Sequence, residues 1–298
     1  MISRRGFLKA AMAGAVAAPA GCGSLPSVFP ERGGKSRLRT ITYNVYACYG
    51  WMPDEEKFKK RRAAAKEKPF MRDMAQRFAE AFRPFRSDII TFSESPAEWV
   101  VKEIADRLEM RHLYFRSGGS YPGTVLTPHE ILESKDCPLV GGGERPKDLF
   151  TRHWGRAVLK TPVGEFILHS AHLHPSKDDI REQEVAEILR AMQSDFAGGR
   201  PLLFQGDLNH TDTKPEYIRW IEAGLVDTSK AAGRGPGITM PKPTGEAPKR
   251  IDYIWSYGAF AKRVREVLVL NRRPFTVNPR DSDSFGLSDH LPVMATFE

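Results

Sequence analysis

Residues that could bind a metal ion or transfer a proton recur in this chain at one kind of position, the end of an apolar segment with strand character. Each position alone has an ordinary explanation, such as a helix cap or a turn. Because strand ends in a layered sheet lie along one rim, we expect these side chains to meet there. The residues are Asn44, Glu94, His172, Asp207, Asn209, Asp252, Asp289 and His290.

Two of these positions are poorly explained by structural needs alone. Asp252 lies inside the apolar segment RIDYIW, where a charge is costly unless it is paired. His290 precedes the alternating segment 291–297, and a histidine supplies no turn geometry that Asn or Gly would not supply better. Arg250 and His290 are both candidate partners for Asp252. The second pairing would be an Asp that orients a catalytic His.

Taken together, the residue types indicate hydrolysis of a phosphoester. Carboxylate and amide oxygens are hard ligands that suit Mg²⁺ or Mn²⁺ better than Zn²⁺. Hydrolysis of an anionic phosphodiester needs a cation on the phosphate oxygens, a group that activates water, and donors for the developing charge. Several carboxylates, two amides and two imidazoles on one rim would supply all of these.

The elements that must position these side chains are mostly strands. Apolar, β-branched segments predict strands at 38–45, 87–94, 112–116, 123–127, 154–160, 164–172, 200–207, 250–256, 265–270 and 291–297. Apolar residues at helical spacing predict helices at 71–82, 96–110 and 178–196. No fixed repeat is present, which argues against a solenoid or propeller. We predict one layered α/β or α+β domain at 37–298.

Six motifs resemble those of the endonuclease/exonuclease/phosphatase superfamily in order and approximate spacing. This superfamily includes DNase I-like nucleases, abasic-site endonucleases, neutral sphingomyelinases and inositol polyphosphate phosphatases. The resemblance covers nearly all of residues 38–298 and implies a DNase I-like fold, a four-layer sandwich of two packed mixed β-sheets flanked by helices. The motifs are TYNV, DIITFSES, SAHLHP, FQGDLNH, RIDYIW and LSDHLPV.

The resemblance implies a site for one Mg²⁺ ion, with Mn²⁺ as the alternative. Glu94 would be the principal ligand, assisted by Asn44 and Asp289. Ser93 departs from the pattern, because the family usually has Gln before the metal-binding Glu. This departure removes one amide from the edge of the site.

The resemblance also implies the groups that perform the chemistry. Asp207 would position or deprotonate the attacking water, and Asn209 with His172 would contact the phosphate and its developing charge. Asp252 would orient His290, which would contact the phosphate from the opposite side. On this reading His290 is catalytic.

The other histidines have weaker claims. His172 is chosen over His169 and His174 because AHL matches the family's THL. His172 and His174 share a strand face and could hold a second metal ion, but we prefer one metal because a surface histidine is the usual case. No role is assigned to His112, His129, His153 or His210.

The N-terminal segment predicts export. Residues 1–22 contain Arg4, Arg5 and Lys9, then an Ala-rich apolar run that is too short to cross a bilayer. SRRGFLK resembles the twin-arginine motif of bacterial export signals. PAGC, ending at Cys22, resembles a weak lipoprotein cleavage box. We expect a periplasmic or extracellular protein, with a lipid anchor on Cys22 as an alternative, and a linker at 23–36 rich in Gly, Pro and Ser.

The substrate is less well defined by the sequence. The chain has 45 Lys and Arg against 37 Asp and Glu, a net charge of +8, which suits an anionic substrate. The segment 51–70 contains seven cations and could follow a phosphate backbone, or it could be a solvated helix face balanced by its own acids. We favour nucleic acid. The alternatives are a phospholipid or a small phosphomonoester, and a binding lipoprotein that has lost catalysis.

Two further expectations concern assembly and cysteines. We expect a monomer. An oxidising compartment would permit a disulfide between Cys48 and Cys137, and two free buried thiols are an equally good interpretation.

Overall fold

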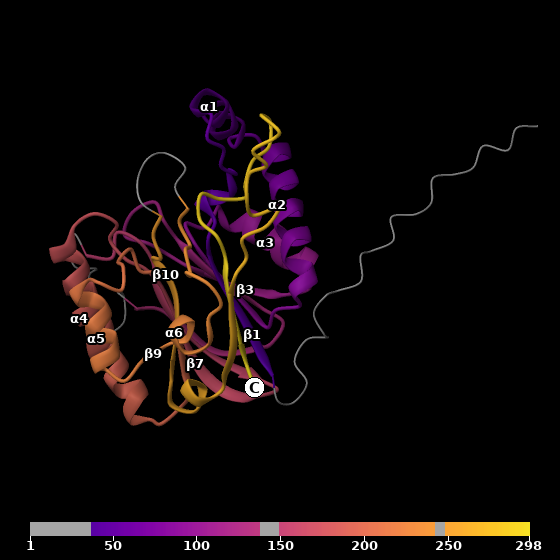
Figure 1. Ribbon diagram of the computed structural model, residues 1–298. Coiled ribbons are helices and arrows are strands. Elements are labelled where there is room, and N and C mark those ends of the chain that lie inside the picture. Colours follow the sequence, from indigo (N-terminus) through magenta and orange to yellow (C-terminus); the bar gives the residue numbers. More distant parts are fainter. Residues whose placement is uncertain (1–36, 138–148, 242–247) are drawn as a thin grey trace, which may run out of the picture.

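A computed structural model describes residues 37–137, 149–241 and 248–298 of the chain (Figure 1). The predicted export signal at 1–22, including Cys22, and the predicted linker at 23–36 lie outside the described residues. Within the described residues, no helix combines the length and the apolar character that crossing a membrane requires.

The strands form two mixed six-stranded sheets, as expected. The first sheet has the order β11-β12-β1-β2-β4-β3. These strands are β11 (Val264–Val269), β12 (Val293–Phe297), β1 (Leu38–Asn44), β2 (Ile89–Ser93), β4 (Gly123–Thr127) and β3 (Arg111–Phe115). The second sheet has the order β5-β6-β7-β8-β10-β9. Its strands are β5 (Glu130–Asp136), β6 (Trp154–Thr161), β7 (Gly164–His172), β8 (Leu202–Asp207), β10 (Asp252–Tyr257) and β9 (Val226–Asp227).

Helices cover the outer face of each sheet, which gives four layers. In Figure 1, α2 (Lys68–Phe82) and α3 (Glu98–Leu108) lie along one side of the molecule, while α4 (Asp178–Ala197) and α5 (Pro215–Glu222) lie along the other. The apolar side chains between the sheets include Leu38, Leu168, Leu203, Ile254 and Phe297. The fold is therefore the DNase I-like sandwich that the motifs imply.

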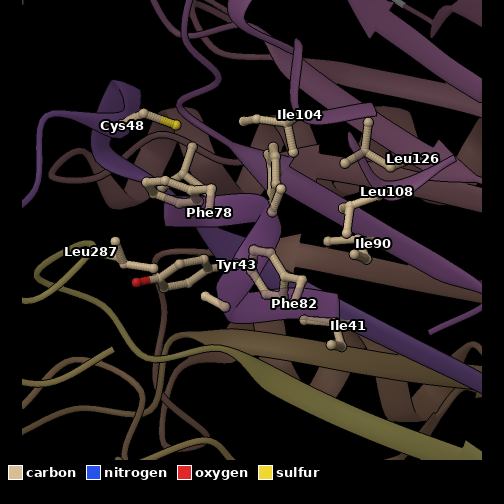
Figure 2. Packing of buried hydrophobic residues seen from close by; sticks show 14 of the residues in the cluster. Ile41, Tyr43, Cys48, Phe78, Phe82, Ile90, Ile104, Leu108, Leu126 and Leu287 are labelled. Atoms are coloured by element: carbon tan, nitrogen blue, oxygen red, sulfur yellow. The ribbon is translucent and has the colours of Figure 1, made fainter. Parts of the chain in front are cut away.

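The layer between the first sheet and its helices is rich in aromatic rings. Figure 2 shows Phe78 and Phe82 of α2 beside Tyr43 of β1. The rings of Tyr43 and Phe82 meet edge to face, with centroids 6.0 Å apart. Burial of these large side chains fixes the helix on the sheet. The buried positions repeat at helical spacing in α2, as the sequence predicted.

Several elements were not predicted. They are the edge strand β5, α5, the short strand β9, α6 (Thr228–Ala232), and the 3₁₀ turns η1 (Tyr46–Cys48), η2 (Arg83–Phe85) and η4 (Gly258–Lys262). The helix expected at 96–110 begins at Glu98, two residues after Pro96. The segment 51–70 contains the helix α1 (Glu55–Ala64), which has no buried residue. In Figure 1 this helix stands beyond the sheets, at one end of the molecule.

The two cysteines of the described residues are free and buried. Cys48 belongs to the core under α2 and α3, whereas Cys137 belongs to the core under α4. The disulfide that an oxidising compartment would permit is therefore not formed.

Candidate active site

The pairing register of the strands brings the predicted residues together. In the second sheet, His172 of β7 pairs with Asp207 of β8, and Asp207 pairs in turn with Asp252 of β10. In the first sheet, Asn44 at the end of β1 pairs with Ser93 at the end of β2. Because the two sheets are stacked, all these strand ends lie at one rim. The sequence could not supply this register, which depends on tertiary pairing.

One amide joins the two sheets at this rim. The side-chain nitrogen of Asn44 donates to Glu94 Oε1 at 3.2 Å and to Asp207 Oδ2 at 2.9 Å. The amide oxygen of Asn44 accepts the backbone N–H of Tyr46. Asn44 and Asp207 are both buried. Asn44 thus holds a carboxylate of each sheet in place, and its oxygen is turned toward the following loop.

Two of the site residues have left-handed backbone conformations. Glu94 has φ 51° and Asn209 has φ 52°. Asn enters this region readily, but for Glu the conformation is unusual and carries strain of order 1–3 kcal/mol. The strained turn directs the Glu94 carboxylate back toward Asn44. Such strain is maintained where the surrounding structure fixes the turn.

A buried histidine lies between two buried aspartates. His290 Nδ1 is 2.8 Å from Asp252 Oδ2, and His290 Nε2 is 3.8 Å from Asp207 Oδ2. Arg250, the other candidate partner of Asp252, instead pairs with Asp227 at 2.7 Å. Asp252 therefore orients the His290 ring and leaves Nε2 directed at Asp207.

The pKa values of His290 and Asp207 are shifted by burial and by the charges next to them. Burial opposes a charge on His290, but Asp252 and Asp207 outweigh it and raise the pKa of His290 well above its usual value. Burial, assisted by Asp252, raises the pKa of Asp207. A carboxylate with a raised pKa is a stronger base than an ordinary carboxylate, and an imidazolium is a stronger hydrogen-bond donor than a neutral imidazole.

His172 approaches Asp207 from the other side. Its Nε2 is 3.6 Å from Asp207 Oδ2. Burial and the nearby charge of Arg152 hold the pKa of His172 well below its usual value, so the ring is neutral. Asn209 donates from its backbone N–H to Asp207 Oδ1 and from its side chain to the carbonyl of Leu173. Both residues therefore border the Asp207 carboxylate.

His174 does not join this group. Its Nδ1 accepts the backbone N–H groups of Ser176 and Lys177, and its main chain is held by Glu184 and Arg181 of α4. His174 therefore fixes the turn before α4, and its geometry does not favour a second metal ion.

Two residues support the site in ways that the sequence did not predict. Ser93, where the family usually has Gln, accepts the backbone N–H of Asp207 at 3.4 Å. Gln205 is buried between the sheets and donates to the carbonyl of Ile41 and to Thr91 Oγ1. The argument that singled out Asp252, a polar group inside an apolar strand, applies equally to Gln205 in LLFQGD.

The residues at the rim have the chemistry of a site for a hard cation. The ligand atoms of Asp207, Asp252 and His290 lie within 4.8 Å of one another and form a group that could hold a metal ion. Their mutual hydrogen bond occupies His290 Nδ1 and Asp252 Oδ2, whereas among the described residues the Glu94 carboxylate accepts a side-chain hydrogen bond from Asn44 alone. Burial raises the pKa of Glu94, and the nearby charge of Asp289 adds to this effect. A divalent cation would relieve the repulsion among these acids.

Comparison with known proteins agrees with this geometry. A model of the "Endonuclease/Exonuclease/phosphatase family" matches residues 41–290, from β1 to the histidine of the site. No curated protein sequence matches the chain significantly.

Solved structures share the fold at low sequence identity. A mannosyl-6-phosphatase from Bacteroides thetaiotaomicron has a TM-score of 0.66 and 18% identity, over 87% of this chain and 98% of that one. An endonuclease/exonuclease/phosphatase family protein from the same species has a TM-score of 0.65 and 17% identity, over 88% and 96%. Truncated TDP2 from Caenorhabditis elegans has a TM-score of 0.61 and 18% identity, over 88% and 97%.

These solved structures support the fold assignment, whereas the family match supports the type of reaction. The family match spans residues 41–290 and so includes all eight predicted site residues. The chain therefore belongs to the endonuclease/exonuclease/phosphatase family, whose hydrolases act on phosphoester bonds.

Proposed function

We propose that this protein is a Mg²⁺-dependent phosphodiester hydrolase with nucleic acid as its favoured substrate. The observation that carries the proposal is the buried line of Asp252, His290 and Asp207, which lies beside Glu94 through the bridging amide of Asn44. In the proposed mechanism these residues act as a base, a proton-bearing donor and an acid that binds a cation, all around one point.

Each residue has a separate task in the proposed reaction. Asp207, with its raised pKa, accepts a proton from the attacking water. The His290 imidazolium, held by Asp252, donates a hydrogen bond to the phosphate oxygens. Neutral His172 and the Asn209 amide contact the phosphate from the other side of Asp207.

The cation would be held by Glu94, with Asn44 and Asp289 beside it. When bound, it neutralises charge on the phosphate and polarises the P–O bond. Asn44 can contribute its oxygen only if its amide turns from the Tyr46 N–H, since that oxygen accepts the Tyr46 N–H here. Asn209 already donates one side-chain N–H to the carbonyl of Leu173 and would use its second N–H for the phosphate.

Charge supports nucleic acid over the alternatives. The chain has a net charge of +8, of which Arg4, Arg5 and Lys9 in residues 1–22 contribute three, and electrostatic attraction provides most of the sequence-independent affinity for nucleic acids. A phosphomonoester is the second candidate, because one structural relative is named a mannosyl-6-phosphatase. A lipid substrate has less support. Among the exposed large apolar side chains of the described residues, only Ile218 and Ile221 share an element, α5, and Trp99, Tyr121 and Leu132 lie elsewhere in the sequence.

The test compares substrates and variants under one set of conditions. Plasmid DNA, RNA, sphingomyelin, bis-p-nitrophenyl phosphate and mannose 6-phosphate would be incubated with the protein and Mg²⁺. Asp207→Asn and His290→Ala should each lower turnover by orders of magnitude, whereas His112→Ala, outside the site, should not. Chelation by EDTA should abolish activity and Mg²⁺ or Mn²⁺ should restore it.

The outcomes separate mechanism from substrate. Cleavage of DNA or RNA that Asp207→Asn lacks supports the whole proposal. Cleavage of the monoester or lipid alone keeps the mechanism and removes nucleic acid. Turnover that persists in EDTA or in Asp207→Asn contradicts the mechanism.

We also propose that the enzyme is exported through the twin-arginine route. The support is the sequence of residues 1–22 alone, with Arg4 and Arg5 before a short apolar run. Replacement of both arginines by lysine should retain the protein in the cytoplasm in cell fractionation. Unchanged export of this variant would contradict the proposal.

A further inference from the structure

A basic pocket lies at the C-terminal end of α1, in the segment that separates β1 from α2. It has a volume of about 410 Å³ and is lined by Tyr49, Lys59, Arg62, Ala63, Ala65 and Lys66. Three of its lining residues are cationic and none is acidic. The lining residue Tyr49 is held in place by Arg61, whose side chain donates to the carbonyl of Tyr49 at 3.2 Å. The Arg61 guanidinium itself packs over the ring of Phe285, 3.5 Å from its centroid.

The charges of this helix are segregated. Asp54 caps its N-terminus, and the acids Glu55 and Glu56 occupy its first turn, where the helix dipole favours them. Lys57 and Lys59 pair with acids at that end of the helix or beyond it, Lys57 with Asp283 and Lys59 with Glu55 and Glu56.

Of the three cations that line the pocket, Lys59 has these partners, whereas Arg62 and Lys66 do not. Within residues 37–137, 149–241 and 248–298, neither Arg62 nor Lys66 has a carboxylate at ion-pair distance. The helix dipole favours a cation at the position of Arg62. It does not account for Lys66, which lies beyond the end of the helix, or for the ring of Tyr49 in the pocket lining. These cations are therefore available to an external anion.

The pocket is joined to the active site by a short rigid turn. Shortly after Asn44, the residues Tyr46, Ala47 and Cys48 all have left-handed backbone conformations. The backbone N–H of Ala47 donates to the carbonyl of Glu94 at 2.8 Å. From Asn44 to Tyr49 is five residues, which span at most about 18 Å even when extended. The pocket wall therefore lies within a few nucleotides' length of the metal-site acids.

Aromatic contacts make this connection continuous. The ring of Tyr46 stacks on Phe58 of α1 at 5.6 Å and meets Tyr49 edge to face at 6.1 Å. Burial raises the pKa of Tyr46, Asp289 adds to this shift and Arg62 opposes it. Charges of both the site and the pocket therefore act on the Tyr46 side chain.

We propose that this pocket binds a second phosphate of the same substrate, the flanking phosphate of a single-stranded nucleic acid whose scissile phosphate lies at Asp207 and His290. The proposal rests on nucleic acid as the favoured substrate of the site. Arg62 and Lys66 supply the charge, and Tyr49 supplies a ring on which a base or sugar can pack. A small phosphomonoester could not reach both places.

The experiment measures binding without turnover. A fluorescein-labelled single-stranded oligonucleotide is titrated with the full chain in EDTA, and anisotropy gives the Kd at several salt concentrations. The test variant is Arg62→Gln/Lys66→Gln. The matched control is Lys60→Gln/Lys68→Gln, which removes the same charge from exposed positions of the same segment that do not line the pocket. Thermal unfolding verifies that both variants fold.

Loss of two phosphate contacts should reduce the slope of log K against log salt by about 1.4, since each contact on a single strand contributes about 0.7. A fourfold rise in salt should therefore weaken the wild type about sevenfold more than the test variant. The control should keep the wild-type slope.

The outcomes distinguish this proposal from the proposed function. Equal salt-dependence slopes and equal affinities for the test and control variants overturn the assignment of the pocket to a flanking phosphate, whether or not the enzyme cleaves DNA. Weaker binding by the test variant alone supports it, and absence of cleavage with Mg²⁺ would then overturn only the nuclease assignment. Binding to phosphatidylglycerol vesicles is measured in parallel. If the test variant binds the oligonucleotide as the control does and loses only vesicle binding, the proposal is also overturned, because the pocket would then bind a membrane.

Discussion

Replacement of Asp252 by Asn tests the central feature of the site with the least change in shape. The Asp252 carboxylate lies 2.8 Å from His290 Nδ1, and both side chains are buried. At that separation a pair of unit charges interacts by about 6 kcal/mol with an effective dielectric constant of 20. The measured cost of removing one partner of a buried pair is smaller, about 3–5 kcal/mol.

Expressed fully in the transition state, this cost corresponds to a fall in kcat of about two hundred- to five-thousand-fold. KM should change much less, because Asp252 acts through His290 rather than on the substrate. Steady-state kinetics on bis-p-nitrophenyl phosphate would separate the two parameters. The ¹⁵N shifts of the His290 ring should report the lost imidazolium, which a merely structural role would not produce.

Asp195→Asn is the matched control. Asp195 is also paired with a buried histidine, since its Oδ2 lies 2.9 Å from His169 Nε2, but the pair lies outside the site. This variant should lower the unfolding temperature and leave kcat of the folded enzyme close to that of the wild type. A kcat of Asp252→Asn within a few-fold of the wild type, or a loss no larger than that of the control, would refute the assigned role.

Two other predictions concern stability. At Gly206, with φ 149°, an added Cβ would lie 1.8 Å from the carbonyl oxygen of Ala171, so Gly206→Ala should destabilise by about 3–5 kcal/mol and lower the unfolding temperature by about 10 °C. Gly164→Ala, with open space around it, is the control, and equal losses would contradict the argument. Burial lowers the pKa of His210 to about 3, and its Nε2 accepts from Trp220 Nε1. The neutral form is thus favoured by folding, and the contribution is complete above the unfolded pKa of about 6.5 and lost as pH falls from there toward 3. Between pH 7.5 and 5 the loss should be about 2 kcal/mol in denaturant unfolding, and a His210→Gln variant with the same pH dependence would contradict this assignment.

Local sequence patterns predicted most of the regular structure. The strands with continuous apolar character and the helices with apolar residues at helical spacing were identified because burial imposes those patterns on the sequence. The edge strand β5 was missed because five of its seven residues are exposed and carry no apolar alternation. The helix α4 was expected, but its buried Arg181 and Glu184 were not, since charged residues ordinarily face solvent.

The sequence by itself determined the family, the types of residue at the rim and the chemistry that those types permit. Tertiary structure decided which of them touch. Asp252 had two candidate partners, and only the packing of the 288–292 turn against β10 selected His290 over Arg250. Likewise, the basic segment 51–70 had two interpretations, and in the folded protein Lys57 and Lys59 pair with acids whereas Arg62 and Lys66 line a pocket without such partners among the described residues. The physical reason is the same in both cases. Residue types and local periodicity are recorded along the chain, whereas distances between residues far apart in sequence depend on sheet register and on the stacking of the two sheets.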